Sequence, residues 1–138
     1  MSAERNLEVV RRSMGPLESV LEAHDEIYSP SWVGHFPGMP PLDSDGHRFY
    51  AQAMQAAFPD LERSVEDLFA ADGDKVVLRW TAEGTHEGDF NGLPPTGVTA
   101  KSSGITIFRL EDGKIAEEWA ESDMLGLLQQ VGAIPTPG

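Results

Sequence analysis

Alternating apolar and polar side chains run through the C-terminal half of the chain and predict β-strands. In the segment 75–86, Val76, Leu78 and Trp80 fall on one face of a strand, whereas Val77 and Arg79 fall on the other. Similar patterns predict further strands at about 63–71, 98–110 and 114–122. The turns that join these strands in pairs contain Asp-Gly, which is a strong hairpin signal. The pattern therefore predicts a four-stranded antiparallel meander.

The N-terminal half instead shows the spacing of amphipathic helices. One helix is expected after Ser2, a second short helix from Pro16, and a third that begins after Asp43 or Ser44 and ends before Pro59. The predicted buried face of the third helix consists of Phe49, Ala53, Met54, Ala57 and Phe58. A closing helix is expected at about 124–131, loops at 28–42 and 88–97, and a tail from 132 to 138.

Helices followed by an antiparallel sheet predict an α+β architecture, with one domain over residues 1–138. A chain of this length has room for one core and one pocket. Because the sheet is apolar on both faces, we expect its concave side to wrap around the helices. The convex side is then free to pack against a second subunit, which predicts a homodimer or a higher homo-oligomer.

Composition narrows the classes of partner and chemistry. The formal net charge of −13 argues against nucleic acid or an anionic membrane as a partner. The absence of cysteine excludes disulfides, thiolate zinc sites and a cysteine nucleophile. Charged residues such as Glu4 and Arg5 are unlike a signal peptide, and no apolar run is long enough to span a bilayer, so a cytoplasmic location is expected.

The end of the last predicted strand carries a candidate acid or base. Trp119 and Asp123 are four residues apart, so on a strand they share a face, which we expect to be the inner one. Burial beside an indole raises the pKa of a carboxyl group and suits it to proton exchange with carbon acids. The alternative interpretation is that Asp123 caps the helix that begins at Met124.

Two further carboxylates have the same parity in this strand as Asp123. Glu117 and Glu121 would then face the same pocket, where three carboxylates repel one another. We expect a bulge or the strand end to turn at least one of them outward. The sequence does not decide which of the two faces the pocket.

Four pieces spread over the chain carry a resemblance to a known family. They are Trp32 with His35-Phe36-Pro37; Phe58-Pro59-Asp60-Leu61; the segment 85–92 with Pro95-Thr96-Gly97; and the segment 113–132 with Trp119 and Asp123. On these residues the chain resembles the SnoaL-like polyketide cyclases of the nuclear-transport-factor-2-like superfamily. The resemblance implies a cone-shaped α+β barrel, with N-terminal helices packed into a curved four-stranded antiparallel sheet.

The resemblance also implies an activity, a cofactor-independent intramolecular aldol condensation of a polyketide-like substrate. The family's acid/base aspartate corresponds to Asp123, which would remove a proton from a methylene flanked by carbonyls. The substrate itself stabilises the carbanion, so the resemblance implies neither metal nor organic cofactor. Two alternatives stay open, namely a cofactor-free hydroxylase on the same fold and a non-catalytic binding or dimerisation domain.

Other candidate site residues follow from the motifs and the aromatic content. His35 and His86 are candidate catalytic hydrogen-bond donors, although a loop histidine bonded to backbone and a turn-fixing histidine are the alternative interpretations. His24 and His47 are expected to be surface or packing residues. No metal-ligand spacing is present. A flat hydrophobic or aromatic substrate is expected to contact Trp32, Phe36, Met39, Met54, Phe58, Trp80, Phe90 and Trp119.

Overall fold

The computed structural model describes residues 2–90 and 92–135, so Asn91 of the predicted 88–97 loop and part of the predicted tail lie outside the described residues. The helices in this part of the chain are α1 (Ala3–Ser13), α2 (Leu17–Glu22), α3 (His24–Ile27), α4 (Ser44–Ala57) and α5 (Met124–Gln130). The strands are β1 (Tyr28–His35), β2 (Glu62–Ala70), β3 (Lys75–Thr85), β4 (Thr99–Glu111) and β5 (Lys114–Ser122).

The helices begin where side-chain caps predict them. Ser2 accepts a hydrogen bond from the backbone N–H of Arg5 at the start of α1, and Asp43 accepts one from Gly46 at 2.8 Å at the start of α4. The predicted buried face of α4 is partly wrong, because Phe49 is 75% exposed and Ala53 is also exposed. The helix turns a different set of residues toward the interior, namely His47, Tyr50, Ala51 and Met54, with Phe58 just past its end.

The sheet has five strands in the order β1-β5-β4-β3-β2, so the prediction of four strands is one short. The extra strand, β1, lies in the segment predicted as a loop and pairs in parallel with β5. Pro30 and the serines beside it favour a loop in the sequence pattern. Proline has no backbone N–H to donate, but β1 lies at the edge of the sheet, where this is tolerated. The other strands pair in antiparallel fashion, as the meander predicts.

The hairpin between β4 and β5 confirms the predicted Asp-Gly turn. Asp112 has a φ of 52° and Gly113 a φ of 79°. Two successive positive φ angles suit the right-handed twist of the flanking strands, and Asp followed by Gly tolerates them. The turn joins β4 and β5 as antiparallel neighbours. β5 then runs on to the start of α5.

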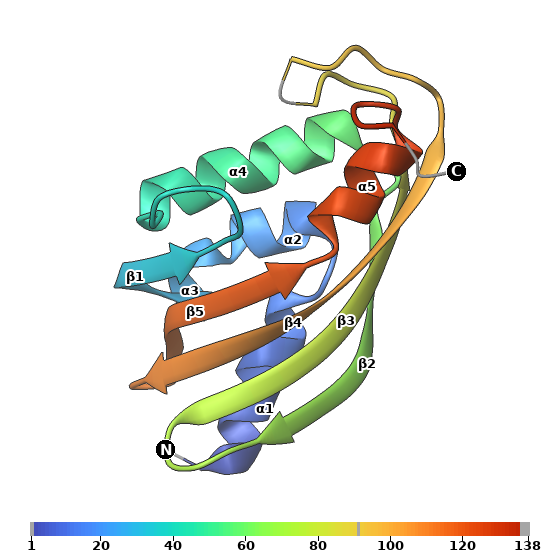
Figure 1. Cartoon of the computed structure of the whole chain (residues 1–138). Coiled ribbons are helices and arrows are strands. Elements are labelled where there is room, and N and C mark those ends of the chain that lie inside the picture. The colour runs from blue at the N-terminus through green and yellow to red at the C-terminus, as the bar shows by residue number, and fades with distance from the viewer. Residues whose placement is uncertain (1, 91, 136–138) are drawn as a thin grey trace.

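The sheet curls around the helices, which lie on its concave side (Figure 1). On β3, Val76 and Leu78 are buried on the inner face, whereas Arg79 is exposed on the outer face. The core forms two clusters, one around Trp32 and Leu78 and the other around Phe58 and Leu127. This confirms the predicted α+β class, as a curved sheet that stays open. None of the helices in the described residues is long and apolar enough to cross a membrane.

The outer face of the sheet carries a transverse row of mostly apolar side chains, one from each strand. Neighbouring strands pair these residues directly, in the order His35, Trp119, Ile107, Val77 and Phe69. Phe69 is 52% exposed, and Ile107 and Trp119 are also exposed. We call these five residues the outer-face row.

Candidate functional site

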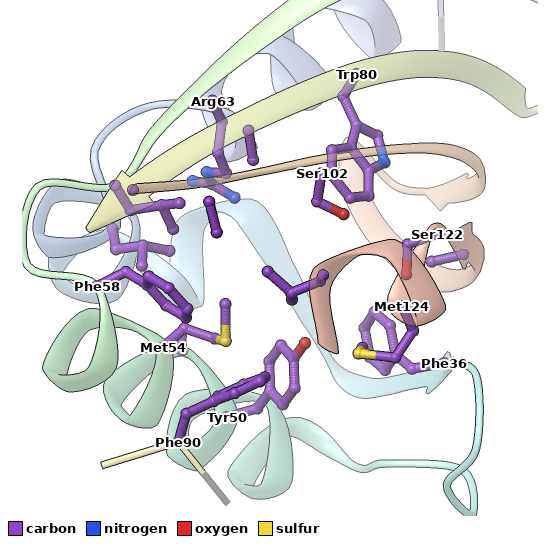
Figure 2. Close-up of a pocket in the computed structure, with 18 of the residues that line it drawn as sticks. Phe36, Tyr50, Met54, Phe58, Arg63, Trp80, Phe90, Ser102, Ser122 and Met124 are labelled. Carbon is purple, nitrogen blue, oxygen red and sulfur yellow. The ribbon is translucent and has the colours of Figure 1, made fainter. Parts of the chain in front are cut away.

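A cavity of about 220 Å³ lies between the two core clusters, because members of both line it. Its walls come from α4, from the inner face of the sheet and from the first turn of α5 (Figure 2). Most of the lining is apolar: Met14, Leu17, Phe36, Pro37, Met39, Ala51, Met54, Phe58, Leu61, Trp80, Ala82, Gly84, Phe90, Ala100, Ala120, Met124 and Leu127. Such a cavity suits a hydrophobic small molecule held by a few polar groups.

Six of the eight residues that the sequence predicts as substrate contacts line this cavity: Phe36, Met39, Met54, Phe58, Trp80 and Phe90. The other two lie elsewhere. Trp32 is 1% exposed in the core, where its Nε1–H donates a hydrogen bond to Glu118. Trp119 is on the outer face of the sheet, where its ring stacks on His35 with a centroid separation of 5.6 Å.

The predicted orientation of β5 is therefore wrong by one residue. Glu118 and Ala120 are buried and Ser122 lines the cavity, whereas Trp119 and Glu121 are exposed. The alternation also puts Glu117 on the outer side, so neither of the two carboxylates left open by the sequence faces the cavity. The inner face of this strand is built from small side chains and one glutamate, which leaves space for the cavity.

Asp123 does not lie among the residues that line the cavity, although its neighbours Ser122 and Met124 do. The carboxylate is exposed and accepts a hydrogen bond from the backbone N–H of Gly126 at 2.9 Å, which caps α5. This is the geometry of the capping interpretation. The expected burial of Asp123 against Trp119 is wrong, because the two residues lie on the solvent side of the sheet.

The two predicted catalytic histidines also lie outside the cavity. His35 is on the outer face, with its Nε2 2.8 Å from Oε2 of Glu117. His86 is fully buried, its Nδ1 is 3.0 Å from Oγ1 of Thr96, and its ring packs against Phe58 and Phe90 behind the cavity wall. The structure thus does not bring His35, His86 and Asp123 together.

The cavity instead contains a cation that the sequence did not single out. Arg63 projects its guanidinium from β2 into the ring of lining side chains, between Phe58 on one side and Trp80 on the other (Figure 2). Its Nη2 donates hydrogen bonds to the backbone oxygens of Ser13 at 3.2 Å and Gly15 at 2.5 Å. Burial lowers the pKa of Arg63, but guanidinium groups stay charged near neutral pH.

His47 lies near Arg63 in the cavity wall. Its Nδ1 is 2.9 Å from Nε2 of His24, and its ring packs on Trp32 with a centroid separation of 4.4 Å. The pKa of His47 is lowered to about 3, mainly because the ring is buried. The charges of His24 and Arg63 lower this pKa further. The ring is therefore neutral at physiological pH.

Behind the cavity, the inner face of β5 holds a buried carboxyl group. Glu118 is 7% exposed, and its Oε1 accepts a hydrogen bond from Nε1 of Trp32 at 3.1 Å. Burial raises the pKa of Glu118 to about 7, against the smaller opposing effects of the Trp32 hydrogen bond and the Arg63 charge. Groups with perturbed pKa values near a cavity are typical of functional sites.

Sequence reasoning missed Arg63, His47 and Glu118 as members of this region. One signal was present for His47, which shares a helical stripe with Tyr50, Met54 and Phe58 at the spacing of one helix face. Within the described residues, no group of three or more histidine, aspartate or glutamate side chains is arranged to hold a metal ion.

Comparison with known proteins identifies the family to which this architecture belongs. The family model for SnoaL-like polyketide cyclases matches residues 10–131. The chain belongs to the SnoaL-like polyketide cyclase family. This match confirms, over most of the chain, the family resemblance inferred from the sequence motifs.

Individual proteins resemble this chain in sequence, and two of them also resemble it in fold. The chain is 28% identical to the aklanonic acid methyl ester cyclase DnrD of Streptomyces peucetius, over 95% of this chain and 94% of that protein. IdmH, a candidate polyketide cyclase from Streptomyces antibioticus, is 32% identical, with a TM-score of 0.79 over 92% of this chain and 98% of IdmH. AclR, a candidate hydroxylase from Streptomyces galilaeus, is 26% identical, with a TM-score of 0.84 over 99% of this chain and 87% of AclR.

Proposed function

We propose that this SnoaL-like protein catalyses a cofactor-independent intramolecular aldol condensation of a polyketide-like substrate held in the cavity. The observation that carries the proposal is the apolar cavity on the inner face of the sheet, in a chain of a polyketide cyclase family. A β-dicarbonyl substrate delocalises its own carbanion. The protein then has to fold the substrate, supply one base and polarise one oxygen.

We assign the base to Asp123, which corresponds to the acid/base aspartate that the family resemblance implies. Its neighbours Ser122 and Met124 line the cavity, so Asp123 belongs to the backbone segment that forms part of the wall, while its carboxylate is exposed to solvent. To reach a bound substrate it must leave the N–H of Gly126. A capping hydrogen bond contributes only about 0.5–2 kcal/mol, so releasing the carboxylate from Gly126 costs little.

Replacing Asp123 with asparagine tests the assignment without removing the cap, because asparagine caps helices as well as aspartate does. Asp123→Asn is expected to fold normally and to lose about 10²–10⁴-fold in turnover, which is the usual contribution of a general base. Asp43→Asn is a matched control, because Asp43 caps α4 through Gly46 in the same way and lies outside the cavity lining. Full turnover in Asp123→Asn would show that Asp123 only caps α5 and is not the base.

The similarity to AclR favours a second candidate of hydroxylase type, a cofactor-free oxygenation in which the carbanion adds O2 and the resulting hydroperoxide loses water to leave a carbonyl, so that the substrate itself supplies the electrons. Both reactions begin with the same proton abstraction, so the cavity serves either. A screen of polyketide-like substrates with mass detection separates the outcomes. Loss of one water supports the cyclase, and a gain of one oxygen atom with loss of two hydrogen atoms supports the hydroxylase-type oxygenation. An unchanged ligand would support a binding domain and overturn both.

A further inference from the structure

Most polar side chains that line the cavity are engaged elsewhere or exposed. Nη2 of Arg63 donates to two backbone oxygens, and Nδ1 of His47 lies 2.9 Å from Nε2 of His24. Nε1 of Trp80 donates a hydrogen bond to Oγ1 of Thr106 at 3.1 Å. The carboxylate among the lining residues is exposed. The remaining polar groups of the lining are hydroxyl groups.

We propose that the hydroxyl of Tyr50 polarises the substrate by donating a hydrogen bond to the carbonyl oxygen that becomes the enolate oxygen. The proposal rests on the proposed function and deepens it, because that reaction needs one base, assigned to Asp123, and one polarised oxygen. When the C–H bond breaks, its proton goes to the carboxylate and its electron pair moves onto the carbonyl oxygen. Tyr50 keeps its own proton throughout and stabilises the charge that develops.

The ring of Tyr50 is held in an orientation that directs its hydroxyl into the cavity. Tyr50 lies on α4, one turn before Met54, and both side chains line the cavity. The Tyr50 ring stacks on that of Phe36, with a centroid separation of 5.5 Å and an interplanar angle of 10°. Figure 2 shows the hydroxyl pointing toward the middle of the ring of labelled side chains. A ligand that fills the cavity therefore meets this hydroxyl.

The hydroxyl of Tyr50 forms no hydrogen bond with the described residues. Burial raises the pKa of Tyr50 from its ordinary value of 10.0, so the hydroxyl stays protonated and can donate at neutral pH. A phenylalanine would pack against Phe36 equally well, whereas a hydroxyl in an apolar wall costs free energy until it finds a partner. That partner must come from the contents of the cavity.

Ser102 and Ser122 carry the two competing hydroxyls of the lining. A phenolic hydroxyl is more acidic than an aliphatic one, so it is the better donor to an enolate oxygen. The two serines are therefore the internal comparison for each measurement on Tyr50.

The binding test uses two flat ligands of the same shape, 2-acetylnaphthalene and 2-isopropenylnaphthalene, of which only the first has a carbonyl oxygen. Calorimetry on the full chain should show that Tyr50→Phe weakens binding of the ketone about three- to tenfold, as expected for one neutral hydrogen bond, and leaves the hydrocarbon unchanged. Tyr28→Phe is the matched control, because Tyr28 is a buried tyrosine outside the cavity lining and should change neither affinity.

The infrared stretch of the bound ketone, isotope-labelled at its carbonyl carbon, reports the hydrogen bond directly. Its frequency should be lower in the wild-type protein than in Tyr50→Phe, because a hydrogen bond to the oxygen weakens the C=O double bond. Ser102→Ala and Ser122→Ala should leave the frequency at its wild-type value. A role for Tyr50 in packing alone would not move this frequency.

The effect on catalysis is measured with a substrate that the wild-type protein cyclises. Tyr50→Phe should lower kcat about 10²–10³-fold with little change in KM, which is the usual cost of removing one donor to a developing oxyanion. The loss falls on kcat because the hydrogen bond strengthens as the oxygen becomes anionic.

Each outcome decides the proposal. An unchanged carbonyl frequency in Tyr50→Phe, a change in a serine variant instead, or no binding of the ketone by the wild-type protein would overturn it. If Tyr50→Phe does not fold, fluorotyrosine in place of both tyrosines supplies a stronger donor and must lower the frequency of the bound ketone further.

The two proposals fail separately. Full turnover in Tyr50→Phe would refute Tyr50 as the polarising group and leave the proposed function intact. A wild-type protein that binds the ketone through Tyr50 but converts no substrate would refute the proposed function and leave the hydrogen bond to the carbonyl standing.

Discussion

Replacing Glu118 with glutamine is expected to stabilise the protein at alkaline pH and to leave its stability unchanged near pH 4. Glu118 is buried, and its pKa is raised from the ordinary value of 4.5 to about 7, chiefly by burial. Ionisation therefore costs folding free energy. Glutamine has nearly the same shape, keeps an oxygen that accepts the N–H of Trp32, and never ionises.

The sign and size of the effect follow from proton linkage. Between pH 4.5 and about 7, the folded protein binds more protons at Glu118 than the unfolded chain does, so this group lowers stability as the pH rises. Above pH 7 the penalty is fully present and amounts to about 3 kcal/mol. His47, whose pKa falls to about 3, has the opposite effect below pH 6.5, but it titrates in both proteins and cancels from the difference.

Urea unfolding of both proteins between pH 4 and pH 9, followed by circular dichroism, measures this difference. With a urea dependence of about 1–3 kcal/mol per molar, the midpoint of Glu118→Gln should exceed that of the wild-type protein by about 1–3 M at pH 9. Glu121→Gln is the control, because Glu121 lies on the same strand but is exposed. If the curves of Glu118→Gln and wild type stay parallel across the range, Glu118 is not the buried titrating group described here.

Three further predictions concern the rest of the molecule. Gly88→Ala should destabilise the protein by about 1–3 kcal/mol in urea unfolding, because its Cβ would clash with the backbone oxygen of Ala56; a neutral effect would contradict this packing. The protein should sediment as a homodimer at about tens of micromolar, and Ile107→Glu in the outer-face row should yield monomers; a monomeric wild type would refute the use of this face. Turnover should persist after exhaustive chelation and without added nucleotide cofactors; loss of activity that a divalent ion restores would refute cofactor-free catalysis.

The sequence predicts most elements of this fold because their signals are local. The cap at Asp43, the stop at Pro59 and the Asp112-Gly113 turn each act within a few residues, and the structure shows all three in use. β1 could not be predicted in the same way. It is held by parallel pairing with β5, some 85 residues away, while its own Pro30 indicates a loop. Tertiary pairing decides its structure rather than local preference.

The orientation of β5 shows why the site was harder to predict than the fold. A general preference for buried aromatics favours Trp119 inside and Glu118 outside, yet the structure has the reverse. A strand that borders a cavity has to present small side chains there, and Ala120 and Ser122 meet that need on the inner face. Trp119 on that face would occupy the space that a ligand requires. β5 thus breaks the ordinary burial pattern at the place where it forms the cavity wall. Such exceptions are expected where a functional cavity competes with core packing.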